Sequence, residues 1–167
     1  MERGLAQGEQ AAERAELGAA LQSRATELAQ RWRRLLFQGD VQQASERTAL
    51  LQDVAEPLLF EAGRQLASGG SGATGPWSRC TGLLRLSPAR GAPGLDEEFA
   101  ALQDVVEAFA AALDAPLAAR RRLRTYLEAA RLLSRAELAR KLDPLAPRPA
   151  APFGGVVVEL YERALWH

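Results

Sequence analysis

The stretch from Gly94 to Leu142 restricts the fold most, because two apolar stripes at helical spacing flank a single turn signal there. In the first half, apolar residues recur at alternating intervals of four and three, which places them on one face of a helix. They are Leu95, Phe99, Leu102, Val106, Phe109 and Leu113, and we expect Phe99 to Phe109 of this stripe to be core. Asp114-Ala115-Pro116 then interrupts the pattern. The stretch predicts two long helices joined by a tight turn.

The ends of these two helices carry their own signals. Asp96 is placed to cap the first helix, and Glu97 and Glu98 suit the positive end of its dipole, so we expect a solvated acidic start. Pro116 suits the first position of the second helix because a proline there loses no hydrogen bond, and Asp114 is placed to cap it.

The second half of the stretch pairs an apolar side with a basic one. Its expected buried residues are Leu117, Leu123, Leu127, Ala130, Leu133, Leu138 and Leu142, with Tyr126 near the edge. Its arginines outnumber its glutamates, whereas the polar face of the preceding helix is acidic. Antiparallel packing would bring the two charge sets together, but an exposed ion pair contributes only about 0–1 kcal/mol. We expect the apolar stripe to hold the hairpin and the charges to select its partner and direction.

Three further helices are expected around this hairpin. One spans about 11–37, after ten residues expected to fray, and is anchored by Leu17, Leu21, Leu28, Leu35 and Leu36. Another spans about 45–67, where Pro57 should start, kink or split it, and a short one spans about 76–86. The pattern of residues 1–142 therefore predicts one all-α domain of about five helices. We expect this domain to be globin-like or an irregular helical bundle, with a central antiparallel hairpin.

Residues 143–155 form a linker rich in proline and glycine, and residues 156–167 follow as a separate C-terminal segment. Its three valines raise strand propensity, but we prefer a helix. The segment is too apolar for a solvated tail. We predict that it docks on the helical body or on a partner, with Leu160, Tyr161, Leu165 and Trp166 as contact residues.

The composition limits the classes of partner and the cellular compartment that fit this chain. The chain has 21 basic and 21 acidic residues, and this neutrality argues against a dedicated nucleic-acid binder. Cys80 is the only cysteine, which points to a reducing compartment. No apolar run is long enough for a membrane span and the N-terminus lacks a signal-peptide pattern, so we expect a cytoplasmic protein.

The sequence supplies no catalytic, cofactor-binding or metal-ligating set, so we predict that the protein is not an enzyme. His167 is the only histidine and the last residue, which argues against haem ligation, and Cys80 has no neighbouring base. The basic runs 31–34 and 120–124 are candidate phosphate contacts, the first with Trp32 as a stacking residue. Solvated, ion-paired faces are the preferred interpretation. The alternative function is binding of a small apolar ligand, in a candidate pocket formed by Trp32, Phe99 and Phe109.

Four segments in this order carry a family resemblance. They are Arg31-Trp32-Arg33-Arg34-Leu35-Leu36, the helix around Pro57-Leu58-Leu59-Phe60-Glu61, Leu83-Leu84-Arg85-Leu86 followed by Ser87-Pro88, and Glu98-Phe99-Ala100-Ala101-Leu102. Residues 15–142 resemble the RsbRD-type N-terminal sensory domain, a globin-like domain of stressosome co-antagonists that is related to domains preceding bacterial histidine kinases. The resemblance implies a haem-free sensor that forms a homodimer and signals to a protein partner such as a kinase or phosphatase. No effector module follows residue 142, which departs from the family. We predict a non-enzymatic sensory or adaptor domain of bacterial signal transduction.

Overall fold

The computed structural model describes residues 2–37, 54–68 and 91–142, and these ranges hold four helices and no strand. The helices are α1 (Glu2–Leu36), α3 (Ala55–Ser68), α5 (Gly91–Ala112) and α6 (Leu117–Leu142). The predicted all-α class is confirmed for this part of the chain. The predicted short helix at 76–86, the linker and the C-terminal segment with Leu160, Tyr161, Leu165 and Trp166 lie outside the described residues.

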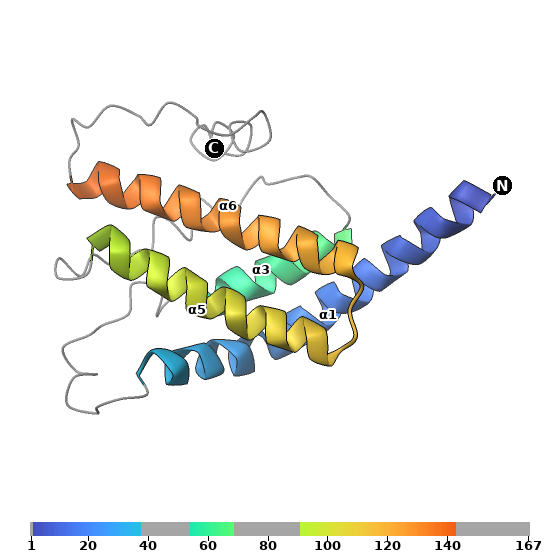
Figure 1. Ribbon diagram of the computed structural model, residues 1–167, viewed down its shortest axis with the longest axis horizontal. Coiled ribbons are helices and arrows are strands. Elements are labelled where there is room, and N and C mark those ends of the chain that lie inside the picture. The colour runs from blue at the N-terminus through green and yellow to red at the C-terminus, as the bar shows by residue number, and fades with distance from the viewer. Residues whose placement is uncertain (1, 38–53, 69–90, 143–167) are drawn as a thin grey trace.

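The four helices form a bundle of two antiparallel pairs (Figure 1). α1 packs mainly on α3 and also on α5, and α6 packs on α5 and α3. The predicted antiparallel hairpin is the α5–α6 pair. The α1–α3 pair completes the bundle, with α3 and α5 running in the same direction (Figure 1).

Backbone contact between Gly18 and Gly63 brings α1 and α3 unusually close. A Cβ atom built on Gly18 would lie 2.4 Å from the carbonyl oxygen of Gly63 and 2.7 Å from the amide nitrogen of Ala67. A Cβ atom on Gly63 would lie 2.5 Å from the carbonyl oxygen of Gly18. Only glycine fits at either position, so these two residues set the distance between the helices.

α1 begins at Glu2, so the helix predicted for about 11–37 starts nine residues earlier than expected. The N-terminal part of the helix projects beyond the bundle, and its residues Gly8, Gln10, Ala11 and Ala12 are exposed (Figure 1). Further along, Leu17, Leu21 and Leu28 are buried as predicted. Leu35 is 44% exposed, which corrects its prediction as an anchor, whereas Leu36 is half-buried and packs against the core.

Two helices begin with a proline in their first turn. α3 starts at Ala55, two residues before Pro57, and α5 starts at Gly91, two residues before Pro93. The first turn of a helix has no intrahelical acceptor for its N–H groups, so a proline there removes no bond. Pro57 therefore starts its helix, one of the outcomes predicted for it. The prediction that Asp96 caps α5 is wrong, because α5 begins five residues earlier.

The turn between α5 and α6 is a Schellman motif centred on Asp114. This residue has φ 51°, and its N–H donates to the carbonyl oxygen of Ala111 at 3.0 Å. The N–H of Ala115 donates to the carbonyl oxygen of Ala110, also at 3.0 Å. The backbone of Asp114 thus ends α5. Asp114 was predicted to cap α6 instead. α6 begins at Leu117, and the carbonyl of Pro116 accepts its first hydrogen bond, from Arg120.

The buried core follows the predicted stripes in the middle of the hairpin and departs from them at its ends. Phe99, Leu102 and Val106 are buried, but Phe109 is only half-buried, because Val105 and Ala110 take the buried positions beside it. On α6 the predicted Leu123, Leu127, Ala130, Leu133 and Leu138 are buried, and Tyr126 lies half-buried at the edge. The side chain of Leu142 lies outside the described part.

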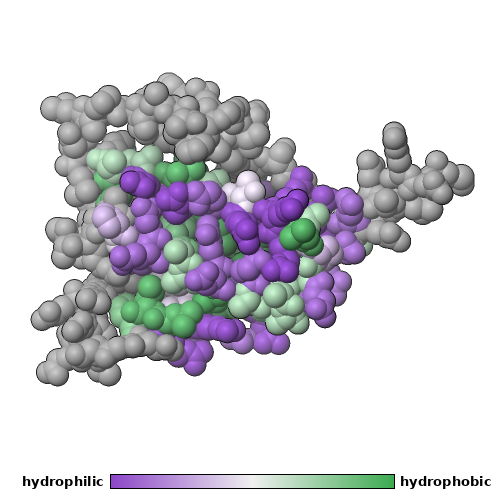
Figure 2. All heavy atoms as spheres, in the orientation of Figure 1, coloured by the Kyte–Doolittle hydropathy of each residue, from purple (hydrophilic) through white to green (hydrophobic). Residues whose placement is uncertain are grey.

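Leu113 and Leu117 lie on either side of the turn. The prediction that Leu117 is buried is wrong, and Leu113, the last residue of the first stripe, is exposed as well. Leu113 is 47% exposed and Leu117 is 59% exposed. Figure 2 shows apolar atoms in green among the hydrophilic surface in purple at this end of the hairpin. The stripes continue to the turn, but these two leucine side chains lie outside the core cluster that the four helices form.

Candidate functional site

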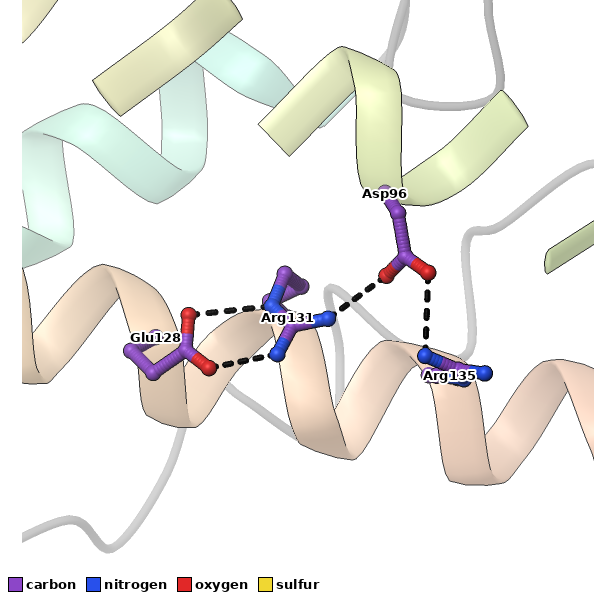
Figure 3. Close-up of polar contacts among 4 residues, drawn as sticks. All are labelled: Asp96, Glu128, Arg131 and Arg135. Atoms are coloured by element: carbon purple, nitrogen blue, oxygen red, sulfur yellow. Dashed lines mark hydrogen bonds and ion pairs between the residues drawn. The ribbon is translucent and has the colours of Figure 1, made fainter. Parts of the chain in front are cut away.

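Two sets of ion pairs join α5 to α6, one near each end of the hairpin. Near the turn, Glu107 accepts hydrogen bonds from Arg120, with Nε 2.9 Å from Oε1, and pairs with Arg124 at 3.5 Å. Near the open end, Asp96 Oδ1 pairs with Arg131 at 2.7 Å and Oδ2 pairs with Arg135 at 2.9 Å (Figure 3). The predicted meeting of an acidic helix with a basic one is therefore observed. These pairs connect the two helices near both ends of the hairpin.

Arg131 lies between two carboxylates. Its Nε and Nη2 donate to the two oxygens of Glu128 at 2.9 and 2.5 Å, while Nη1 donates to Asp96 (Figure 3). The hydrogen bonds from Arg131 lower the pKa of Glu128, and those accepted by Glu128 and Asp96 raise the pKa of Arg131. Every side-chain nitrogen of Arg131 is thus committed to a structural contact. We interpret this group as a clamp between helices.

Two carboxylates that sequence reasoning placed in solvent or overlooked are buried. Glu98 is 0% exposed, which corrects the prediction of a solvated acidic face, and its backbone carbonyl accepts the indole N–H of Trp32 at 2.9 Å. Glu61 on α3 is 6% exposed and accepts hydrogen bonds from Arg64 and Gln65. The hydrogen bond that Arg64 donates to Glu61 raises the pKa of Arg64. No periodicity signal marks either residue, because a glutamate inside an amphipathic pattern is normally assigned to the polar face.

The residues of the candidate apolar pocket occupy different depths. Trp32 and Phe99 are fully buried in one core cluster, whereas Phe109 packs at its margin. The hydrogen bond to Glu98 fixes the indole of Trp32 and links α1 to α5. These contacts are those of core side chains, and a ligand site at the three residues stays a prediction.

The two arginine runs have different roles. Trp32 points into the core while Arg31 and Arg34 are exposed, so run 31–34 does not present its aromatic ring beside its charges. In run 120–124, Arg120 and Arg124 pair with Glu107. Arg121 and Arg122 are exposed and form no ion pair with any described residue. Only part of the basic face is therefore neutralised within the hairpin.

A compact apolar surface lies at the α5–α6 turn. We call it the hairpin tip, and define it by the exposed residues Ala108, Ala111, Ala112, Leu113, Leu117 and Ala118. Asp114 is the only charged residue between Ala108 and Ala119, and Arg121 and Arg122 follow one turn along α6. The tip therefore combines exposed apolar side chains, the exposed carboxylate of Asp114 and a basic border. It is the feature of the described surface that sequence reasoning missed, since its leucines fit the buried stripes.

The described residues offer neither a metal site nor a membrane span. They contain no group of three or more histidine, cysteine, aspartate or glutamate residues arranged to hold a metal ion. None of their helices is both long and apolar enough to cross a membrane. Comparison of the chain with protein-family models, curated protein sequences and solved structures finds no match.

Proposed function

We propose that this protein is a non-enzymatic helical adaptor or regulatory domain that acts through protein contacts made at the hairpin tip. The observation that supports this proposal is the pair of exposed leucines, Leu113 and Leu117. They are 47% and 59% exposed, and exposed alanines lie beside them in the sequence. A single exposed leucine is ordinary on a protein surface, but exposed apolar residues gathered on both sides of one turn favour an interaction site.

The border of the tip supports a protein as the partner. Protein interfaces combine an apolar centre with a polar rim, and arginine is enriched in them. Arg121 and Arg122 supply such a rim, and neither side chain is engaged in an ion pair with a described residue. Their guanidinium groups favour a partner that carries carboxylates next to its apolar contacts.

The resemblance to the RsbRD-type sensory domain suggests the setting for this activity. On that basis we propose a cytoplasmic role in bacterial signal transduction, with a kinase or phosphatase among the candidate partners. The C-terminal segment with Tyr161 and Trp166 would add a second contact. The alternative function, binding of a small apolar ligand at Trp32, Phe99 and Phe109, stays a prediction with no contact that favours it over core packing.

The test compares three versions of the full-length chain in the cells that produce it. In-cell crosslinking followed by mass spectrometry identifies the proteins joined to the wild type, and binding is then measured with each purified partner. We expect Leu113→Asp/Leu117→Asp to weaken that binding at least tenfold. Phe60→Asp is the control, because Phe60 is 49% exposed on α3 and lies outside the tip. Equal binding by the wild type and the tip variant would refute the proposal.

A further inference from the structure

The exposed face of α6 changes from apolar to basic over its first two turns. Leu117 and Arg121 are four residues apart, as are Ala118 and Arg122, and all four are exposed. Residues at this spacing lie on the same face of a helix, about 6 Å apart along its axis at a rise of about 1.5 Å per residue. The apolar half of this face belongs to the hairpin tip, and the basic half forms its border. We call these four residues the α6 strip.

The two arginines of the α6 strip are not neutralised within the hairpin. Residues 107–124 hold four arginines and two carboxylates, a net charge of +2 in a chain whose basic and acidic residues are equal in number. Arg121 and Arg122 form no ion pair with a described residue, whereas the other two arginines pair with Glu107. The guanidinium groups of the strip are therefore open to a carboxylate from outside the described bundle.

We infer that the α6 strip binds a short acidic peptide segment of a partner protein. An apolar side chain of that segment lies on Leu117, and its carboxylates pair with Arg121 and Arg122. The inference rests on the proposed function, since both place the contact at the hairpin tip. It goes further by stating the chemistry of the partner, the size of the contact and the orientation of the bound segment.

The small extent of the surface favours a short segment over a folded domain. A standard interface between two folded proteins buries roughly 800 Å² on each side and involves about 20–30 residues of each partner. The six residues of the hairpin tip and the two arginines on its border fall well short of that number. They match a segment that brings one or two apolar side chains and a pair of carboxylates.

The charges around the strip determine the orientation of an acidic segment. A guanidinium group can form two parallel hydrogen bonds with one carboxylate, and such charge-assisted bonds are about twice as strong as neutral ones. Asp114 has the opposite effect at the apolar end, because its exposed carboxylate repels acidic side chains there. The carboxylates of the segment are thus directed to the arginine end. Complementary charges of this kind fix orientation more than they add affinity.

The same charge pattern disfavours an anionic membrane surface as the occupant. Insertion of Leu113 and Leu117 into a membrane would carry Asp114 into the layer of negatively charged headgroups. Two leucines also supply little apolar area for membrane binding, which scales with the apolar area buried. A peptide segment can place its carboxylates away from Asp114, whereas a uniformly anionic surface cannot.

The experiment measures binding of labelled peptides to the full-length chain by fluorescence anisotropy. The probe is a short alanine-based peptide with leucine and glutamate side chains on one face at a spacing of four residues. Its counterpart carries lysine at the glutamate positions. The acidic peptide should bind about tenfold more tightly than the lysine peptide. This difference should shrink as salt rises from about 0.1 M to about 1 M, because the Debye length falls from about 10 Å to about 3 Å.

Two double variants of the full-length chain test the arginines. Arg121→Gln/Arg122→Gln should weaken binding of the acidic peptide about tenfold. Arg31→Gln/Arg34→Gln is the matched control, because it removes the same charge from two exposed arginines of α1, and it should leave the binding unchanged. Circular dichroism of both variants should show the helicity of the wild type.

Three results would overturn the inference. The first is equal affinity for the acidic and the lysine peptide, or an equal loss of binding in the two arginine variants. The second is a partner protein whose binding needs Leu113 and Leu117 but neither Arg121 nor Arg122, which would leave the proposed function intact. The third is binding of phosphatidylserine–phosphatidylcholine vesicles in place of the acidic peptide, with the same dependence on the arginines, which would assign the α6 strip to a lipid surface.

Discussion

Replacement of Gly18 by alanine tests the closest contact in the bundle. The added Cβ atom would lie 2.4 Å from the carbonyl oxygen of Gly63 and 2.7 Å from the amide nitrogen of Ala67. Both neighbours are backbone atoms, so no side chain can swing aside, and α1 and α3 must separate by roughly 1 Å to restore an ordinary contact. Overpacking of this kind costs about 1–3 kcal/mol.

A second effect of Gly18→Ala has the opposite sign. Alanine is favoured over glycine inside a helix by about 0.5–1 kcal/mol. Because the clash involves backbone, we expect the cost to lie in the upper part of its range and the net loss of stability to be about 1–2 kcal/mol. Gly8→Ala isolates the favourable effect, since its Cβ would meet nothing within 4 Å.

The assay is urea unfolding of both variants and the wild type, followed by circular dichroism at 222 nm, the standard wavelength for helix content. Gly8→Ala should unfold at a slightly higher midpoint than the wild type, and Gly18→Ala at a clearly lower one. If Gly18→Ala proved as stable as Gly8→Ala, α1 and α3 would not approach each other at Gly18, and the packing described above would be wrong.

Three further predictions address the turn, the core margin and the clamp. Asp114→Gly should stabilise the chain by about 0.5–1 kcal/mol in thermal unfolding, because glycine adopts the positive φ at this C-cap without strain; a loss of stability would contradict the capping role. Phe99→Ala should cost about 3–5 kcal/mol, whereas Phe109→Ala should cost clearly less, because only the first ring is fully buried; equal losses would place both rings in the core. Glu128 has a lowered pKa in the folded protein, so its contribution to stability is present above its unfolded pKa and is lost as the pH falls through the folded value. Urea midpoints between pH 6 and pH 3, spanning the usual pKa of about 4.3, should therefore fall more steeply for the wild type than for Arg131→Gln, and parallel curves would show that the clamp does not act on Glu128.

The apolar periodicity of the chain predicted its helices well in the middle and poorly at the ends. Leu123 and Leu127 are buried because the middle of the α6 stripe faces the core of the bundle. Leu113 and Leu117 follow the same spacing but are exposed, because they lie at the turn, outside the core cluster. Periodicity indicates the face of a helix that can be buried. The lengths and offsets of the neighbouring helices decide how much of that face is buried.

Helix starts were misjudged for a related reason. The glycines and proline of residues 91–94 have the composition of a connector, yet α5 begins at Gly91. A proline near the start of a helix is compatible with it, so composition alone does not separate a first turn from a loop. Moving the start of α5 put Asp96 inside the helix, where it pairs with Arg131 and Arg135 instead of capping.

The sequence by itself determined that residues 94–142 form a helical hairpin and that an acidic helix meets a basic one, because side-chain spacing and charge are local properties. The tertiary structure decided which charges pair, because the register of α5 on α6 follows from packing along their whole length. It also decided the burial of Glu98 and the hydrogen bond from the indole of Trp32, 66 residues away in the chain, to its backbone carbonyl. The hairpin tip has the same origin. Its leucines belong to regular stripes and form a surface because no described part of the bundle covers them at the turn.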